Sequence, residues 1–393
     1  MTSKRTFIKA TVGAAAAVWG VGARAQSDNT IRIGLILPMT GQQASTGRQI
    51  NAAVKLWMAQ HGDKVAGKKI EVILKDDAAV PDTTKRLAQE LVVNDKVAVL
   101  AGFGITPTAF ATAPLATQSK TPMVVMAAAT SSITQASPFI VRTSFTLPQV
   151  TIGIAEWAAR NNIKRAVTLV SEYAPGFDAE KFFISQFRLD GGQILNSLRT
   201  PLRAPDFAPV LQKVLDEKPD ALFVFLPSGQ GAAFMKQFAE RGLDKSGIRL
   251  IATGDVTDDD QLNDMGDVAL GFVNSHHYSA AHPSSTNKKF VAAFEAANKF
   301  RPNFMAVGGY DGMRVIYKAL EASKGARGQA LLDAMKGQIF ESPRGPVLID
   351  AQTRDIVQNV YIRKVERVPA MGNQLFNVEF DVIKAVKDPG KTK

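Results

Sequence analysis

Short runs of branched aliphatic residues alternate with longer amphipathic segments from residue 29 onward, and this alternation constrains the fold more than any other feature. Residues 31–37 are typical of a strand that ends at Pro38, and residues 47–61 have the apolar spacing of a helix. The pattern continues with expected strands at 69–74, 97–101 and 123–126 and expected helices at 83–93 and 107–118. Strands joined through helices lie parallel, with the helices packed on the sheet faces. The sequence therefore predicts an α/β fold.

The same alternation starts again after an extended stretch at 139–145. Its expected helices cover 148–161, 179–189, 207–217 and 231–241, and its expected strands cover 166–170, 193–197, 221–225 and 249–253. Because no Pro/Gly/Ser-rich linker separates the two sets, we expect two doubly wound parallel-sheet lobes that share several chain crossings. The remaining expected elements are helices at 287–298, 305–323 and 331–336 and strands at 347–350 and 357–365, followed by a polar tail with Lys391 and Lys393.

The first 25 residues have the features of an export signal. Lys4, Arg5 and Lys9 make a basic start, residues 10–22 are small and apolar, and residues 23–25 read Ala-Arg-Ala. We therefore interpret 1–25 as a signal peptide and expect an exported protein. Residues 3–9 also resemble the twin-arginine export motif, with Lys in place of its first Arg, which leaves the export route open.

Composition removes several kinds of chemistry. The 393 residues include no Cys and four His, so disulfides, thiolate metal sites and cysteine nucleophiles are excluded. Without the basic residues of the signal the net charge falls from +11 to +7, and no run of four basic residues remains. We expect a solvated basic surface and no nucleic-acid partner.

Two acid or histidine groups could suggest a metal site. Asp258, Asp259 and Asp260 are consecutive, but we interpret them as acids at a helix start, which capping and the helix dipole explain. His276 and His277 are adjacent on an extended stretch, so we expect them to point to opposite faces. With no phosphate loop, complete dinucleotide fingerprint or nucleophile elbow, we expect no metal, no cofactor and no catalysis.

Three strand ends could form a ligand site, because ligands of parallel α/β sheets bind beyond the carboxyl ends of strands. At the first, Thr106 is a candidate N-cap with Pro107 at the first helical position. At the second, three alanines lead to Thr130 at the start of a short helix. Both offer backbone N–H groups to a carboxylate. Ordinary capping is the alternative that the local sequence alone favours, and the presence of two such ends within 30 residues strengthens the ligand interpretation. At the third, Tyr173 follows a strand of the second set and could face the first lobe.

The order of these segments resembles the periplasmic substrate-binding proteins of branched-chain amino-acid ABC transporters. The segments that carry the resemblance are residues 31–41, Asp76-Asp77, 97–102, Arg142-Thr143, 171–176, 207–210 and 309–312. The resemblance implies the type I periplasmic-binding-protein fold, in which three crossovers join two lobes that close on a ligand. It divides the chain into a signal peptide (1–25), a first lobe (26–145 plus 277–350) and a second lobe (146–276 plus 351–393). It further implies a periplasmic, monomeric, non-enzymatic protein that serves a membrane permease.

The resemblance also places ligand contacts in the cleft. By position they fall on Phe103, Ile105, Thr106, Ala128, Ala129, Thr130, Tyr173, Pro175, Leu226, Ser228, Gly254 and Asp255.

The chain departs from the amino-acid-binding members at one position. Those members hold the ammonium with a carboxylate where this chain has Gly254, and Asp255 follows one residue later, where extended backbone would turn it away. Apolar neighbours would make a buried ammonium costly. We therefore expect a small carboxylate ligand, an aromatic or 2-oxo acid. The alternatives are a binding protein for branched-chain or other α-amino acids and a ligand-sensing module of the same fold.

Overall fold

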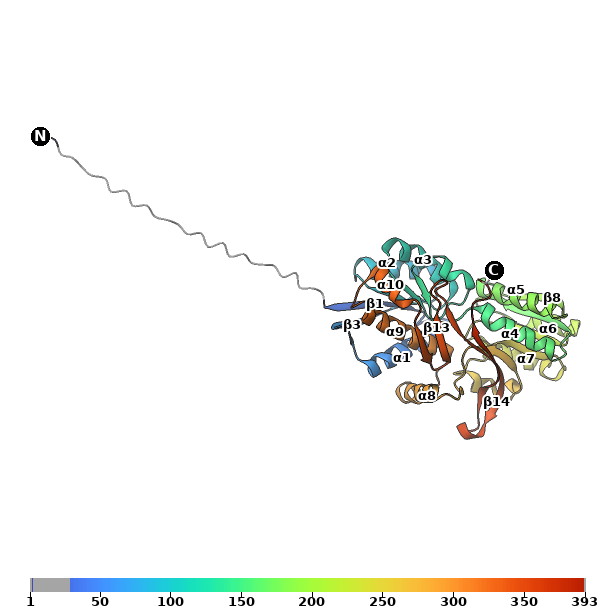
Figure 1. Ribbon diagram of the computed structural model, residues 1–393. Helices are drawn as coiled ribbons and strands as arrows, with labels where there is room; N and C mark the ends of the chain where they lie inside the picture. The colour runs from blue at the N-terminus through green and yellow to red at the C-terminus, as the bar shows by residue number, and fades with distance from the viewer. Residues whose placement is uncertain (1, 3–28, 392–393) are drawn as a thin grey trace.

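The computed structural model describes residue 2 and residues 29–391, which form two α/β lobes side by side (Figure 1). The signal peptide expected at 1–25 lies outside the described residues, apart from residue 2. None of the helices in the described part combines the length and the apolar character needed to cross a bilayer.

The first lobe is built on a six-stranded sheet with the order β2-β3-β1-β4-β5-β6. All neighbours are parallel except β2 and β3, and Leu35 of the central β1 pairs with Leu74 on one side and Ala101 on the other. The strands are β1 (Thr30–Leu37), β2 (Lys64–Val65), β3 (Lys68–Asp76), β4 (Val99–Gly102), β5 (Met123–Val125) and β6 (Ile140–Arg142).

The second sheet has nine strands, with the order β12-β13-β14-β11-β10-β9-β7-β8 and β15 paired to β14. The run β11-β10-β9-β7-β8 is parallel, and the pairings that involve β12 to β15 are antiparallel. The strands are β7 (Arg165–Ser171), β8 (Gln193–Thr200), β9 (Ala221–Phe225), β10 (Arg249–Thr253), β11 (Val273–His276), β12 (Ile339–Ser342), β13 (Gly345–Ile349), β14 (Ile356–Val368) and β15 (Gln374–Val386). The expected fold class is confirmed.

The helices begin where local chemistry favours it. Thr146 and Gln149 form a capping box at α4, Ser284 accepts a hydrogen bond from the amide of Asn287 in α8, and Asn303 caps α9. The α-helices are α1 (Ala44–His61), α2 (Pro81–Val93), α3 (Thr106–Ser119), α4 (Leu147–Arg160), α5 (Ala174–Leu189), α6 (Ala208–Glu217), α7 (Gly231–Glu240), α8 (Ser285–Asn298), α9 (Phe304–Ala322) and α10 (Gly328–Met335). The 3₁₀ helices are η1 (Ser131–Gln135), η2 (Leu243–Lys245), η3 (Leu262–Ala269) and η4 (Pro369–Met371).

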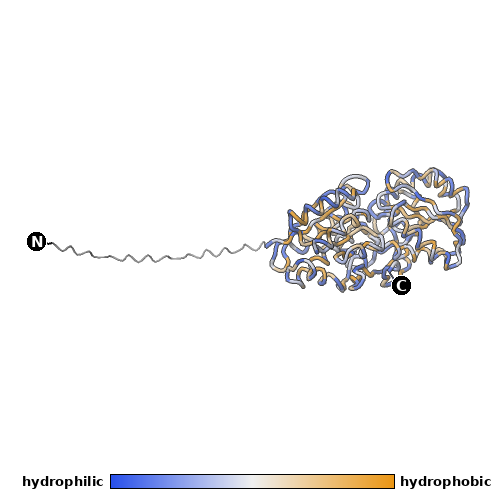
Figure 2. Tube along the Cα trace, turned by 90° about the horizontal axis from the view of Figure 1, so that it is seen from above, coloured by the Kyte–Doolittle hydropathy of each residue, from blue (hydrophilic) through white to orange (hydrophobic). Residues whose placement is uncertain are grey.

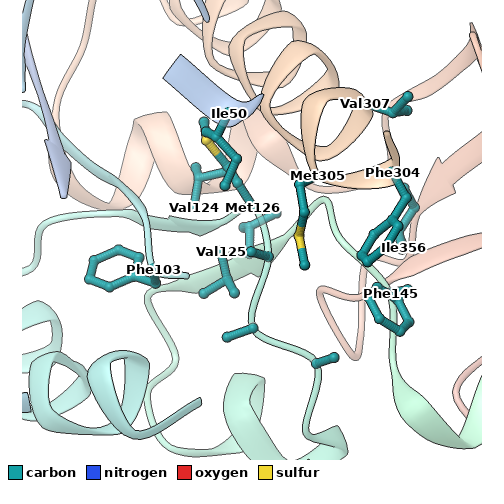
Figure 3. Close-up of a cluster of buried hydrophobic side chains, with 14 of the residues drawn as sticks. Ile50, Phe103, Val124, Val125, Met126, Phe145, Phe304, Met305, Val307 and Ile356 are labelled. Carbon is teal, nitrogen blue, oxygen red and sulfur yellow. The ribbon is translucent and has the colours of Figure 1, made fainter. Parts of the chain in front are cut away.

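Apolar residues lie inside each lobe and hydrophilic residues outside (Figure 2). One buried cluster fills the first lobe and continues across the junction between the lobes, and a second fills the outer part of the second lobe. Figure 3 shows the part of the first cluster at the junction, where Met126 lies beside Met305 and Phe145 lies near Phe304. The ends of the central strands of the first sheet are therefore anchored in a packed core.

The chain passes between the lobes at three places. It leaves the first lobe between β6 and α4, returns between β11 and α8, and passes again through β12 and β13 into β14. β12 and β13 lie within the 277–350 segment expected for the first lobe, and they hydrogen-bond to the second sheet through β14. The lobe boundaries themselves stay a prediction.

The polar tail expected after residue 365 is wrong. Residues 374–386 form β15, which pairs along β14 over most of its length. The segment that follows crosses back to the first lobe: Asp388 accepts hydrogen bonds from Ser131 Oγ at 2.6 Å and Thr146 Oγ1 at 3.0 Å. Lys391, expected in that polar tail, has a buried side chain that forms an ion pair with Asp355.

Candidate functional site

A cavity lies between the lobes at the carboxyl ends of the strands. Its free volume at the centre is about 20 Å³, room for about one water molecule. The residues that line it are Gln43, Gly104, Ile105, Thr106, Ala127, Ala128, Ala129, Phe145, Leu147, Tyr173, Pro175, Phe225, Pro227, Ser228, Asp255 and Met305. The wall is therefore mostly apolar, with a few polar groups.

The first lobe contributes the start of α3. The cap residue is Ile105, not Thr106 as expected; it has no polar side chain, and no side chain caps the helix. Thr106 is the first helical residue, is 1% exposed and donates a hydrogen bond from Oγ1 to Thr130 Oγ1 at 3.1 Å. Because the first N–H groups of a helix have no partner within it, this end offers amide donors and a positive dipole end to an anion.

The second expected anion receptor, at Thr130, is built differently. The amide of Ser131, which begins η1, donates a hydrogen bond at 2.9 Å to Asp178 on α5 of the other lobe. Arg142 holds the carbonyls of Thr130 and Phe145 at 2.8 and 3.0 Å, and its Nε lies 2.9 Å from Asp355. Thr130 therefore accepts hydrogen bonds from Thr106 and Arg142, and it does not line the cavity.

The second lobe contributes aromatic surface. The ring of Tyr173, just before α5, stacks on that of Phe225 at the end of β9, with centroids 6.0 Å apart and an interplanar angle of 21°. Burial, together with the charge of Asp255, raises the pKa of Tyr173 well above its usual value. Tyr173 is therefore neutral and available as a hydrogen-bond donor. Pro175 lines the same wall.

The expectation that Asp255 turns away from the cleft is wrong. Residues 254–257 form a turn, so the alternation of an extended strand does not apply, and Asp255 lines the cavity at 4% exposure. Gly254 does not line it. A Cβ on Gly254 would come within 1.9 Å of Arg363 Nη2, so the glycine makes room for a buried guanidinium. That guanidinium donates from Nε to Asn274 Oδ1 at 2.7 Å.

The expectation for the two histidines is also wrong. His276 and His277 are both fully buried, and their ring centroids lie 4.4 Å apart against Phe145 and Phe304. His276 Nε2 lies 3.5 Å from Asp255 Oδ2, longer than a normal hydrogen bond. Burial lowers the pKa of His276 to about 4, so its ring is neutral near pH 7.

The three consecutive acids do not start a helix, because η3 begins only at Leu262. Asp258 accepts hydrogen bonds from Ser228 Oγ at 3.1 Å and the Gly229 amide at 3.2 Å. Asp260 reaches across to the first lobe, where Ser45 Oγ and Asn303 Nδ2 donate to it at 3.0 and 2.9 Å. The acids thus shape the second-lobe loop and join the two lobes. Within residues 29–391 no group of three or more His, Asp or Glu is placed to hold a metal ion.

Comparison with known proteins decides the family. The model of the family described as periplasmic binding protein matches residues 30–371. This chain belongs to that family. Leu/Ile/Val-binding protein homolog 6 of Brucella abortus (strain 2308) is 42% identical over 381 residues, which is 96% of this chain and 97% of the relative.

Two solved structures support the same assignment of this periplasmic binding protein. The solute binding protein of an ABC transporter from Rhodopseudomonas palustris BisB5, in complex with 3,4-dihydroxybenzoic acid, is 63% identical with a TM-score of 0.91, covering 93% of this chain and 100% of its own. The corresponding protein from Rhodopseudomonas palustris HaA2, in complex with p-hydroxybenzoic acid, is 40% identical with a TM-score of 0.88, covering 92% and 99%.

Most of the cleft residues expected from the resemblance come together in this periplasmic binding protein. Those that line the cavity are Ile105, Thr106, Ala128, Ala129, Tyr173, Pro175, Ser228 and Asp255, and those that do not are Phe103, Thr130, Leu226 and Gly254. Phe103 has a φ of 68°, which turns the chain after β4, and its side chain lies in the first core (Figure 3). Leu226 is buried in the second core.

Several lining residues were not expected from the sequence of this periplasmic binding protein. Phe225 ends β9, so the strand-end rule could have found it. Phe145 follows β6, and Met305 lies in the first turn of α9, far along the chain from the other lining residues. Nothing in the local sequence marks either as a cleft residue.

Proposed function

We propose that this chain is the periplasmic solute-binding component of an ABC uptake transporter and that its ligand is a hydroxylated aromatic carboxylate. The observation that carries the proposal is a cavity in which an uncapped helix start faces stacked aromatic side chains. The sequence leads us to expect an aromatic or a 2-oxo acid, and this geometry favours the aromatic acid. The 63% identical protein solved with 3,4-dihydroxybenzoic acid supports the same class.

The ligand carboxylate would lie at the start of α3. The amides of the first turn are donors there, and Thr106 Oγ1 becomes one when its proton turns from Thr130 Oγ1 to the ligand. No cation is needed because the helix dipole favours a negative charge. The ring would lie along Tyr173, with Phe145 and Met305 closing the far side. Flat apolar walls of this kind stabilise an aromatic ring by burial and by offset ring contacts.

Binding would require the lobes to part and close again. A central free volume of about 20 Å³ does not admit a benzene ring, so access needs a more open arrangement. Hydrogen bonds across the cleft, such as those that Asp260 accepts from Ser45 and Asn303, would break when the lobes part. Hinge closure of two lobes on a ligand is an established kind of transition in binding proteins.

A second candidate ligand is an α-amino acid, and one observation favours it. Asp255 lines the cavity, where its carboxylate could pair with an ammonium group. The 42% identical relative from Brucella abortus is described as a Leu/Ile/Val-binding protein homolog, which also agrees with an amino-acid ligand. The aromatic wall and the identity to the 3,4-dihydroxybenzoate complex favour the aromatic acid.

Calorimetric titration of protein purified without refolding separates these ligands. We expect 3,4-dihydroxybenzoate to bind at least tenfold more tightly than leucine, a difference of about 1.4 kcal/mol. The 2-oxo acid of leucine serves as the control for an aliphatic carboxylate without an ammonium. Tighter binding of leucine, or of its 2-oxo acid, would overturn the proposal.

The location, partners and lack of catalysis are part of the proposal. Family membership supports delivery of ligand to a membrane permease without chemical turnover, and we propose that the chain does this as a monomer. Cleavage after the Ala-Arg-Ala sequence would leave Gln26 as the first residue of the exported chain. N-terminal sequencing of protein from the periplasmic fraction tests this, and recovery of only the uncleaved chain from the cytoplasm would contradict it.

A further inference from the structure

One carboxylate oxygen of a buried acid that lines the cavity has no hydrogen-bond partner within the described residues. Asp255 is 4% exposed, and its Oδ2 makes no hydrogen bond there. The neighbouring group is His276, whose Nε2 lies 3.5 Å from Asp255 Oδ2. Both ring nitrogens of His276 also lack a hydrogen-bond partner among those residues. Asp255 and His276 therefore form an unsatisfied polar pair at the cavity wall.

Such a pair is costly unless a ligand completes it. A buried carboxylate oxygen without a donor loses its hydration and has no hydrogen bond to replace it. His276 is neutral near pH 7, so it does not cancel the charge. The positive charge behind the pair is Arg363, which packs against Gly254 and is fully buried. The site is thus suited to a neutral ligand group that donates hydrogen bonds.

We infer that Asp255 reads ring hydroxyl groups of the ligand, with His276 as a positioning residue behind it. This inference rests on the proposed function, in which the ligand carboxylate lies at the start of α3 and its ring along Tyr173. A phenolic hydroxyl on the ring then donates to Asp255. Two adjacent hydroxyls can donate to both oxygens of one carboxylate, as paired N–H groups of arginine do. The ligand class is therefore a hydroxylated benzoate, with a 3,4-dihydroxy pair favoured.

Weak binding of benzoate, which has no ring hydroxyl, follows from the unpaired carboxylate of Asp255. Benzoate leaves Asp255 unpaired, and sites built to bond a hydroxyl discriminate strongly against analogues that lack it. We expect 3,4-dihydroxybenzoate to bind more tightly than 4-hydroxybenzoate, and 4-hydroxybenzoate at least thirtyfold more tightly than benzoate.

The test is calorimetric titration of these three acids into the full protein and into Asp255→Asn. The variant keeps the size of the side chain and loses its charge. We expect it to bind 3,4-dihydroxybenzoate at least thirtyfold more weakly and benzoate no more weakly than the parent does, because the variant no longer buries an unpaired charge against benzoate, so that discrimination collapses. His276→Gln should reduce the preference for hydroxylated ligands in the same direction but less, with benzoate affinity unchanged.

Asp259→Asn is the matched control. Asp259 follows on the same loop and is buried, but it accepts from Asn377 Nδ2 at 3.2 Å and does not line the cavity. It should keep the preference for hydroxylated ligands even if its thermal stability falls. The inference is overturned if Asp255→Asn loses affinity equally for all three acids, or if the parent binds all three with equal affinity. Either result leaves an aromatic-acid function intact. Tighter binding of leucine than of any benzoate overturns the proposed function itself.

Discussion

Replacing Thr106 by valine tests whether the start of α3 holds the ligand carboxylate. Valine has nearly the same shape and lacks the hydroxyl, which in the parent donates to Thr130 Oγ1 at 3.1 Å and lies 1% exposed at the cavity. A hydrogen bond to a charged group contributes about 1.5–3 kcal/mol. At 1.4 kcal/mol for each factor of ten, affinity for 3,4-dihydroxybenzoate should fall about 10- to 150-fold.

Thr108→Val is the matched control on the same helix. Thr108 is fully buried and donates from Oγ1 to the Ile105 carbonyl at 2.8 Å, but it does not line the cavity. Each variant loses one neutral hydrogen bond within the protein, so each should lose about 1 kcal/mol of folding stability. Only Thr106→Val should also lose affinity.

The assay combines calorimetric titration with urea unfolding of the unliganded proteins. The unfolding data show that each variant is folded at the temperature of titration. If Thr106→Val binds within twofold of the parent, or if Thr108→Val loses affinity equally, the carboxylate does not lie at this helix start.

Three other changes test the structure around the site. Gly254→Ala should lower the free energy of unfolding by about 1–3 kcal/mol, because its Cβ would overlap the Arg363 guanidinium; an unchanged urea midpoint would contradict this. Asp178→Ala removes the acceptor of the Ser131 amide across the lobes, so calorimetry should show about tenfold weaker binding of every ligand, with the order of preference kept. Burial lowers the pKa of His276 from 6.5 to about 4. Below pH 6.5 the unfolded chain takes up a proton on His276 that the folded protein does not, so the free energy of unfolding falls by about 3 kcal/mol in total as the pH falls from 6.5 to 4. Melting temperatures of the parent should therefore fall relative to His276→Asn across that pH range, and a constant difference would refute the assignment.

The alternation of strands and helices could be predicted because it depends on local apolar periodicity. Expected strands such as 221–225 and 249–253 match β9 and β10 residue for residue. The strand β15 was missed although Val378, Phe380 and Val382 alternate with polar residues, a signal that the charged surroundings concealed. Edge strands of this kind bury only part of one face, so their apolar pattern is weak.

The site could be predicted only as far as strand ends define it. Thr106 and Tyr173 follow strands directly, and both line the cavity. The direction of Asp255 depends on a turn that packs closely against the buried guanidinium of Arg363, more than a hundred residues later. Met305 reaches the cavity through the packing of α9 on the first lobe. Contacts of this range leave no mark in the local sequence.

The hydrogen bonds of Asp388 have a consequence for how the chain acquires its structure. Asp388 bonds Ser131 and Thr146, which precede it by 257 and 242 positions and flank the loops that shape the cavity. During synthesis or export the first-lobe sheet can form early from neighbouring segments, whereas these loops must wait for residues made hundreds of positions later. Contacts so distant in sequence form late because closing a long loop costs entropy. A chain that ends before residue 388 therefore lacks both of these hydrogen bonds to the loops beside the cavity.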